Sequence, residues 1–299
     1  MTRFARHTPV ISPEQILSSA DAAPFALPPS PDLFASRSAR FAYLAHQQPH
    51  AAWLDVLAGL CQAQHEALGR YPADQDAVLP LAATAPLPGQ LSDVLQHLVH
   101  SLERTHPKQA APLIAPFRQA VPPAVEPIAR SLLTGSGMVQ DGAGRSLIEA
   151  ALQVIWTARA RSLPATALQP AAERDLCPCC GTPASTALIR IGGSIAGLRF
   201  LHCPLCNTQW NAMRARCTSC ESVREVAQHR LDGRTDAPWP SAAAESCDAC
   251  GSYRKLFNLD KDPAADPVAD DLASLALDVL MGEAGLARNG HLPFMELQG

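Results

Sequence analysis

Four copies of one short motif, two cysteines separated by two residues, constrain this chain more than any other feature. Such a C-x-x-C motif can place both sulfurs on one metal ion when the backbone between them forms a tight turn, here called a knuckle. Two knuckles complete a tetrahedral site of four thiolates, so four knuckles predict two metal sites. The candidate ligands, from the first knuckle to the fourth, are Cys177 and Cys180, Cys203 and Cys206, Cys217 and Cys220, and Cys247 and Cys250.

The residue that follows each knuckle indicates how sharply the chain turns there. A left-handed backbone points N–H groups toward the sulfurs, and glycine adopts it freely while asparagine tolerates it. Gly181, Asn207 and Gly251 follow the first, second and fourth knuckles. Glu221 follows the third knuckle, so we expect a less regular turn there.

Two other readings of the cysteines are disulfides and free redox thiols. The first nine residues lack the apolar core of a signal peptide, and no stretch of 18 apolar residues predicts a membrane helix. We therefore expect a cytoplasmic protein with no membrane insertion. In that reducing compartment clustered cysteines are typical of metal sites or reactive thiols rather than of disulfides.

The segments between the knuckles indicate an internal repeat. Residues 186–191 and 198–202 are strand-like and flank Gly192 and Gly193, which predicts a hairpin between the first two knuckles. Further strands are expected at 210–216, 223–231 and 252–259. Gaps of 22 and 26 residues lie inside the two halves of the repeat and suit a ribbon with a hairpin. We pair the first knuckle with the second and the third with the fourth, although interleaved pairing stays open.

The chain before the knuckles has a helical pattern. We expect helices near Ser12 and over residues 32–47, 50–69, 91–104, 124–133 and 144–162. Cys61 shares a helix face with Leu54, Leu57 and Leu68, which favours a core position over a ligand. No phosphate-binding loop or nucleophile elbow occurs in this half.

A last helix is expected within residues 263–287. The predicted fold class is therefore α+β, with a helical N-terminal domain, two rubredoxin-like or zinc-ribbon-like modules and a C-terminal helix. The predicted boundaries are 1–170 for the helical domain, 171–210 and 211–262 for the two modules, and 263–299 for the helix and tail.

The charge balance disfavours nucleic acid as a partner. Formal net charge is −4, and residues 177–260 hold nine basic and seven acidic side chains. Two divalent ions with eight thiolates would add −4 to that segment. The arginines are thus better suited to offset thiolates than to bind phosphates, because nucleic-acid ribbons usually carry a basic excess.

Several of these stretches resemble one known family. The stretch GLRFLHCPLCNTQW (197–210), RCTSC (216–220), ESCDACG (245–251) and the acidic stretch 262–278 are similar to FdhE, the bacterial formate dehydrogenase accessory family. The resemblance is specific over residues 175–295, while the helical half matches only in general character. The family pattern includes the eight knuckle cysteines but not Cys179, which we regard as a spectator thiol.

The resemblance implies a function without enzymatic turnover. It implies a cytoplasmic protein with two iron-binding rubredoxin-like modules, whose partner is the catalytic subunit of a respiratory formate dehydrogenase before export. Four thiolates suit zinc as well as iron, so zinc remains the alternative metal. A rubredoxin-like electron carrier or thiol oxidoreductase and a zinc-ribbon nucleic-acid-binding protein are the competing functions. The sequence leaves a homodimer open.

Overall fold

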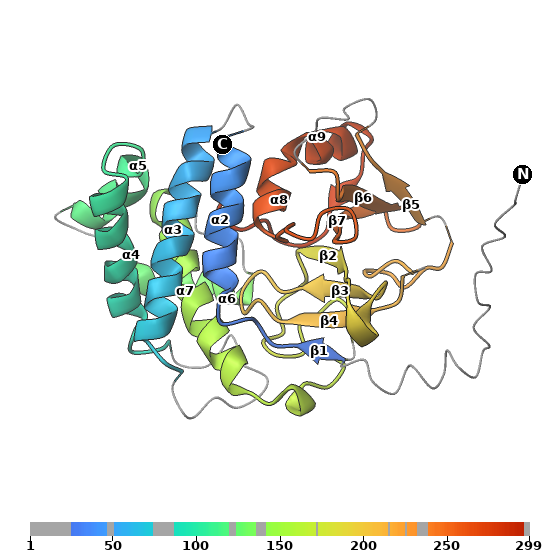
Figure 1. Cartoon of the computed structure of the whole chain (residues 1–299), viewed down its shortest axis with the longest axis horizontal. Helices are drawn as coiled ribbons and strands as arrows, with labels where there is room; N and C mark the ends of the chain where they lie inside the picture. The colour runs from blue at the N-terminus through green and yellow to red at the C-terminus, as the bar shows by residue number, and fades with distance from the viewer. Residues whose placement is uncertain are drawn as a thin grey trace, which may run out of the picture.

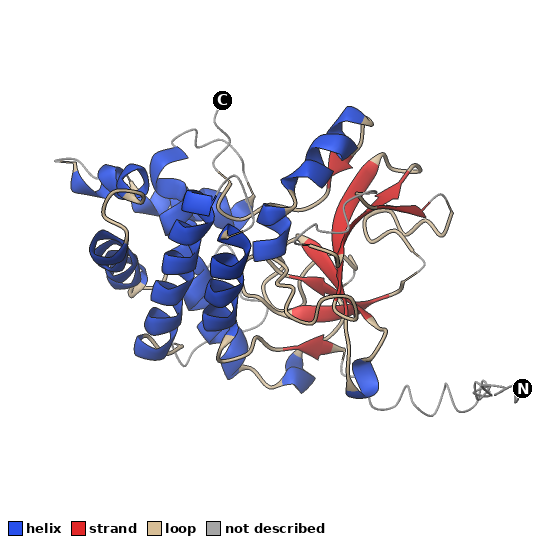
Figure 2. Cartoon of the chain, turned by 45° about the horizontal axis from the view of Figure 1, so that its top comes forward, coloured by secondary structure: helices blue, strands red, loops and turns tan. Residues whose placement is uncertain are grey.

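The computed structural model describes residues 25–46, 51–73, 87–119, 124–135, 142–171, 173–214, 216–224, 226–231 and 239–295. The N-terminal helices gather on one side of the molecule, and the strands lie on the other side together with the C-terminal helices, so the fold is α+β as predicted (Figures 1 and 2). The helix expected near Ser12 lies outside the described residues. Within these ranges, none of the helices has the length and apolar character needed to cross a bilayer.

The helical half follows the predicted periodicity closely. Leu54, Leu57, Cys61 and Leu68 are all buried on one face, which confirms the core position of Cys61. Burial raises the pKa of the Cys61 thiol to about 12, so it stays protonated. The helices of this half are α2 Leu33–Ala45, α3 Ala51–Arg70, α4 Leu91–Thr105, α5 Ala111–Ile114, α6 Val125–Thr134 and α7 Gly142–Ser162, with short 3-10 turns at Ala115–Arg118 and Ala165–Ala167.

All the described strands join one sheet, in the order β1-β4-β3-β2-β7-β6-β5, with β8 beside β7. The predicted hairpin around Gly192 and Gly193 is confirmed, because β2 and β3 pair antiparallel with Thr186 opposite His202. The strands are β1 Ala26–Leu27, β2 Thr186–Ile189, β3 Arg199–His202, β4 Gln209–Ala212, β5 Val226–His229, β6 Ala242–Cys247, β7 Ser252–Asn258 and β8 Ala287–Arg288.

The internal repeat appears as two antiparallel ribbons. The first ribbon contains β2, β3 and β4, and the second contains β5, β6 and β7. A parallel pairing of β2 with β7 joins them, with Thr186 opposite Lys255 and Ile189 opposite Asn258. The sequence did not predict β6, because its alanine-rich stretch lacks the β-branched and aromatic residues typical of strands.

The predicted C-terminal helix is wrong as a single element. It is divided into α8 Ala269–Ala273 and α9 Leu275–Glu283, with Ser274 between them in a non-helical conformation. The buried Lys255 Nζ donates to the carbonyl oxygens of Asp271 at 2.7 Å and Ser274 at 3.1 Å. The same two carbonyls also accept backbone N–H groups three residues further on, from Ser274 at 3.3 Å and from Leu277 at 3.0 Å. The chain therefore makes 3-10-type bonds at the break, where Lys255 contacts it from the sheet side.

Buried ion pairs join the helical half to the C-terminal region. Arg40 of α2 binds Asp270 of α8 through Nε at 2.9 Å and Asp262 through Nη2 at 2.6 Å. One turn earlier, Arg37 binds Asp266 at 2.9 Å. Burial raises the pKa of Asp270 to about 6, although Arg40 opposes that shift. Asp262, Asp266 and Asp270 of the C-terminal region are therefore ion-pair partners of arginines from α2.

Candidate metal centres

The first and second knuckles bring four sulfurs together in what we call site 1. Cys177 Sγ lies 3.5 Å from Cys206 Sγ, and Cys180 Sγ lies 3.4 Å from Cys203 Sγ. A tetrahedral ion with metal–sulfur bonds of about 2.3 Å needs sulfurs about 3.8 Å apart, whereas a disulfide needs about 2 Å. The spacing therefore fits a metal ion and not disulfides.

The third and fourth knuckles form the second cluster, site 2. Cys217 Sγ lies 3.8 Å from Cys250 Sγ, and Cys220 Sγ lies 3.7 Å from Cys247 Sγ. In each cluster all four sulfurs lie within 4.8 Å of one another. The sulfurs thus group as the predicted pairing requires, first knuckle with second and third with fourth, and each group could hold a metal ion.

The turn after each knuckle is left-handed in all four copies. The φ angle is 76° at Gly181, 59° at Asn207 and 64° at Gly251. Glu221 also has a φ of 59°, so the expectation of a less regular turn after the third knuckle was wrong. The fixed geometry of the knuckle imposes this conformation on glutamate even though a side chain disfavours it.

Backbone N–H groups and hydroxyls surround the sulfurs. The amides of Cys179, Cys206 and Ser219 each donate to a knuckle sulfur at 3.4 Å. Thr208 Oγ1 lies 3.2 Å from Cys206 Sγ, and Ser252 Oγ lies 3.1 Å from Cys250 Sγ. The backbone N–H donors stabilise the thiolate form of the cysteines, which is the form that binds a metal.

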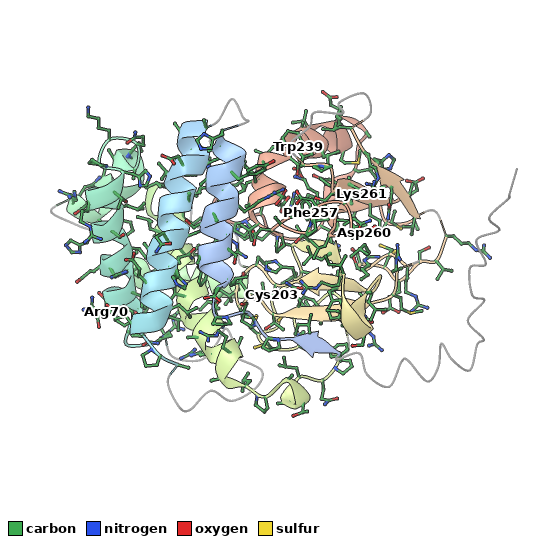
Figure 3. All side chains as sticks on the ribbon, viewed as in Figure 1. Arg70, Cys203, Trp239, Phe257, Asp260 and Lys261 are labelled. Carbon is green, nitrogen blue, oxygen red and sulfur yellow. The ribbon has the colours of Figure 1, made fainter. Side chains whose placement is uncertain are left out.

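Site 1 is buried at the boundary between the helices and the sheet, where Figure 3 places Cys203. Gln153 of α7 donates to the carbonyl oxygen of Pro204, inside the second knuckle, at 2.9 Å. Asn207, just after that knuckle, donates to Thr157 Oγ1 at 2.9 Å and accepts from Arg37 Nη2 at 3.0 Å. Side chains of α2 and α7 therefore hold the second knuckle in place.

Site 2 is open on one side. Cys217 and Cys247 are buried, while Cys220 and Cys250 are exposed. In the third knuckle Ser219 and Cys220 are exposed. Glu221, which follows it, forms a surface ion pair with Arg216 at 3.2 Å. Two sites with the same four sulfur donors thus differ in their access to solvent.

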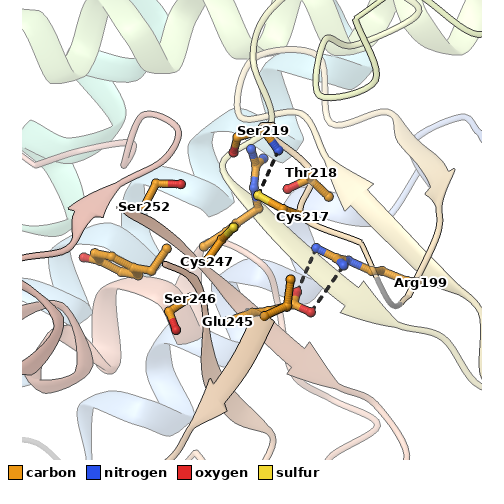
Figure 4. A pocket seen from close by; sticks show the side chains of 11 residues that line it. Arg199, Cys217, Thr218, Ser219, Glu245, Ser246, Cys247 and Ser252 are labelled. Atoms are coloured by element: carbon orange, nitrogen blue, oxygen red, sulfur yellow. Dashed lines mark hydrogen bonds and ion pairs between the residues drawn. The ribbon is translucent and has the colours of Figure 1, made fainter. Parts of the chain in front are cut away.

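Buried arginines lie behind site 2, around a cavity of about 10 Å³ that Cys217 and Cys247 also line (Figure 4). Arg199 Nη2 binds Glu245 Oε2 at 2.8 Å. Arg254 is 3 % exposed, and its Nη2 lies 4.0 Å from a carboxylate oxygen of Asp175. Burial lowers the pKa of Arg254 to about 10, so the guanidinium remains charged at neutral pH.

These charges test whether the cysteines suit a metal ion. Glu245 pairs with Arg199, and Asp175 lies 4.0 Å from Arg254, so each guanidinium group has a carboxylate near it. Four thiolates around a divalent ion carry a charge of −2. Both arginines lie close enough to Cys217 for a thiolate there to raise their pKa, and the same attraction favours the thiolate form of the cluster. This agrees with the sequence-based expectation that arginines offset thiolates.

Cys179 lies inside the first knuckle but outside both four-sulfur groups. It is fully buried, and a hydrogen bond with Cys206 together with burial raises its pKa well above the usual range. Cys179 is therefore a neutral thiol beside site 1, which fits its predicted absence from the ligand set.

Sequence reasoning missed the residues that support site 1 from the helical half. Gln153 and Thr157 lie one turn apart on α7, in the interior of an apolar face, and Arg37 lies on the buried face of α2. A polar residue on an apolar helix face is a signal that it has a buried partner. The sequence alone does not name that partner.

Comparison with known proteins covers nearly the whole chain. Sequence models described as the FdhE N-terminal, central and C-terminal domains match residues 22–173, 176–214 and 215–295. The similarity thus extends through the helical half, beyond the region that the motifs indicated.

Individual relatives agree with these matches. A "Protein FdhE homolog" of Edwardsiella ictaluri is 35% identical over 288 residues, covering 91% of each chain. The homologue of Pseudomonas aeruginosa is 34% identical over 310 residues, covering 93% of this chain and 95% of its own. The crystal structure of the FdhE protein from Pseudomonas aeruginosa superposes with a TM-score of 0.74 at 31% identity, covering 92% of this chain and all of that one. The chain belongs to the FdhE family.

Proposed function

We propose that this protein is a formate dehydrogenase accessory protein that binds the catalytic subunit of a respiratory formate dehydrogenase in the cytoplasm and prepares it before export. Its membership of the FdhE family along the whole chain carries this proposal and supports an accessory role. The protein would act by binding, without enzymatic turnover of its own.

The eight knuckle cysteines are the proposed metal ligands, with one iron ion in each site and zinc as the alternative. The sulfur spacing and the amide donors support a charged four-thiolate centre in both clusters, and the buried arginines support it at site 2. Iron and zinc both accept four thiolates in a tetrahedral arrangement, so the donor set is compatible with either metal. Elemental analysis and absorption spectra of protein purified without added metal would decide between them.

The two sites support different parts of the proposed role. Site 1 lies under α2 and α7, so a metal there would hold the helical half on the first ribbon. Site 2 has two exposed cysteines and includes the turn between β6 and β7 of the second ribbon, so it belongs to the surface that a partner can reach. We therefore assign the partner contact to the second ribbon together with the helical half.

Gene deletion and rescue would test the proposal. Deletion should abolish respiratory formate oxidation while the dehydrogenase polypeptide is still made, and a tagged wild-type copy should restore oxidation and copurify with the catalytic subunit. Rescue should fail for Cys203→Ser with Cys206→Ser, and for Cys220→Ser with Cys250→Ser. Cys179→Ala is the matched control, because it removes a knuckle thiol outside both clusters.

The outcomes separate the parts of the proposal. Full rescue by both double variants would show that the metal sites are dispensable and would move the binding role to the helices. Copurification of nucleic acid in place of a dehydrogenase subunit would contradict the accessory role. Light scattering of the same preparation would distinguish a monomer from a homodimer.

An electron carrier is the second candidate, favoured by the exposure of Cys220 and Cys250. A redox-active iron in site 2 would lie near enough to the surface for exchange of electrons with a partner. Reversible bleaching of the iron absorption by a reductant, together with copurification of a reductase, would support this function over the accessory role.

A further inference from the structure

The two clusters offer the same ligands but differ in what an incoming ligand would meet. A metal ion leaves a four-thiolate site when an outside ligand reaches it and one of its own cysteines detaches. Both steps depend on local structure, namely access to the sulfurs and the free energy of opening one knuckle. Each can be compared between site 1 and site 2.

Access differs sharply between the sites. At site 1 the most exposed ligand is Cys180, at 7 %, and the other three are at most 2 % exposed. A groove of about 750 Å³ between α6, α7 and the first two knuckles is lined by Cys180 and by Pro204 and Leu205 inside the second knuckle. The other three ligand cysteines do not line it. At site 2 Cys220 and Cys250, which come from opposite knuckles, are both exposed.

The restraints on the knuckles differ in the same direction. Opening the second knuckle at site 1 would break the bonds of Gln153 to Pro204 and of Asn207 to Thr157 and Arg37, all buried. At site 2, Arg199 Nη1 holds the carbonyl of Arg216 at 3.2 Å, just before the third knuckle. Beyond that anchor Thr218 stays buried, whereas Ser219 and Cys220 are exposed. The hydrogen bond that Ser219 accepts from Asn289 lies at the surface, so Cys220 can detach without opening the core.

We propose that site 2 exchanges its metal ion with thiol-bearing ligands from outside the chain, while site 1 retains its metal as part of the fold. This inference rests on the proposed metal sites. The exchange is a ligand substitution: each metal–sulfur bond that breaks is replaced by a bond from the metal to the acceptor, and the released cysteines take up protons from water or from the acceptor's thiols. No electrons are transferred.

Chelator competition on the zinc-loaded full chain would test the inference. With 4-(2-pyridylazo)resorcinol present to report released zinc and glutathione as the thiol ligand, we expect two phases of one equivalent each. The fast phase should be at least about tenfold faster than the slow phase, because only site 2 opens locally. Cys250→Ser should remove the fast phase and leave the slow one. Brief alkylation of the loaded protein should modify Cys220 and Cys250 first.

A second variant tests the restraint on site 1 without touching a ligand. Gln153→Ala removes the bond to Pro204 and should speed the slow phase by about tenfold, as expected for a group that supports a ligand. Gln62→Ala on the exposed face of α3 is the matched control and should change neither phase.

Three results would overturn the inference. Release of both equivalents in one phase would show that the sites do not differ. A fast phase that survives in Cys250→Ser would assign exchange to site 1. A protein that binds no zinc or iron after reconstitution would overturn the proposed metal sites themselves, and this inference with them.

Discussion

Arg37 of α2 and Asp266 are 229 residues apart in the chain, and their side chains form a buried ion pair with 2.9 Å between Nε and Oδ1. The same arginine donates from Nη2 to Asn207 beside the second knuckle. Asp266 in turn accepts the amides of Val268 and Ala269 at the start of α8. One side chain therefore connects the helical half, the surroundings of site 1 and the C-terminal helices.

Replacement of Arg37 by methionine should strongly destabilise the protein. It would leave Asp266 buried without its cation, which typically costs about 3–5 kcal/mol of unfolding free energy. Arg118→Met, which breaks a surface pair with Glu103, should cost less than about 1 kcal/mol. Urea unfolding of both variants measures the difference. Equal losses of unfolding free energy in the two variants would show that the Arg37–Asp266 pair does not hold the helical half to the C-terminal region.

Loss of a ligand at site 1 should have wider consequences than loss at site 2. Structural four-thiolate sites supply roughly 10–16 kcal/mol of apparent binding free energy coupled to folding. Cys250→Ser should lose one metal and keep the helical circular dichroism. Cys180→Ser should also lower the melting temperature of the helices, because site 1 supports α7. Metal content and thermal melts check this, and retention of both metals in either variant would contradict the ligand assignment.

Glu221→Gly should stabilise the protein. The left-handed backbone at Glu221 costs a residue with a side chain about 1 kcal/mol relative to glycine. Glu221→Ala is the matched control, because it removes the same surface ion pair with Arg216 but keeps the unfavourable φ. The glycine variant should therefore be more stable than the alanine variant in chemical denaturation. No difference between them would mean that the third knuckle relaxes in solution.

The ion pair of His291 with Glu149 should make stability depend on pH. Nε2 and Oε1 are 2.7 Å apart. Burial opposes the charge, yet Glu149 raises the pKa of His291 above its usual value of about 6.5. A raised folded-state pKa gives stability that is fully present below pH 6.5 and is lost as pH rises through the folded value. The contribution of a half-exposed pair is about 1 kcal/mol or less.

Comparison of His291→Asn with the wild type would reveal this dependence. The difference in unfolding free energy should be larger at pH 5.5 than at pH 8.5. In a Glu149→Gln background the same replacement should show no such trend, because the carboxylate that raises the pKa of His291 is gone. A difference in unfolding free energy that is larger at pH 8.5 than at pH 5.5 would contradict the prediction.

Local patterns in the sequence predicted much of the candidate sites. The C-x-x-C spacing indicated four knuckles and two clusters, because a knuckle is a short-range structure that needs only adjacent residues. The gaps between knuckles favoured pairing the first with the second and the third with the fourth, but they left interleaved pairing open. Helix periodicity placed α2, α3, α4, α6 and α7 to within a few residues and buried Cys61. The repeat likewise indicated two ribbons, although β6 carried too weak a strand pattern to be found.

Long-range contacts decided what the sequence left open. Three contacts join residues far apart in the chain. They are the parallel pairing of β2 with β7, the contact of Lys255 with the break in the last helix, and the hydrogen bond of Gln153 to the second knuckle. Identical C-x-x-C motifs therefore became one buried and one exposed site. The sequence by itself determined which two cysteines of a knuckle can bind one ion, since that depends on neighbouring residues. The folded chain brings the first knuckle to the second and the third to the fourth. Only the tertiary structure decided which ion can be reached, because burial depends on which surfaces pack together.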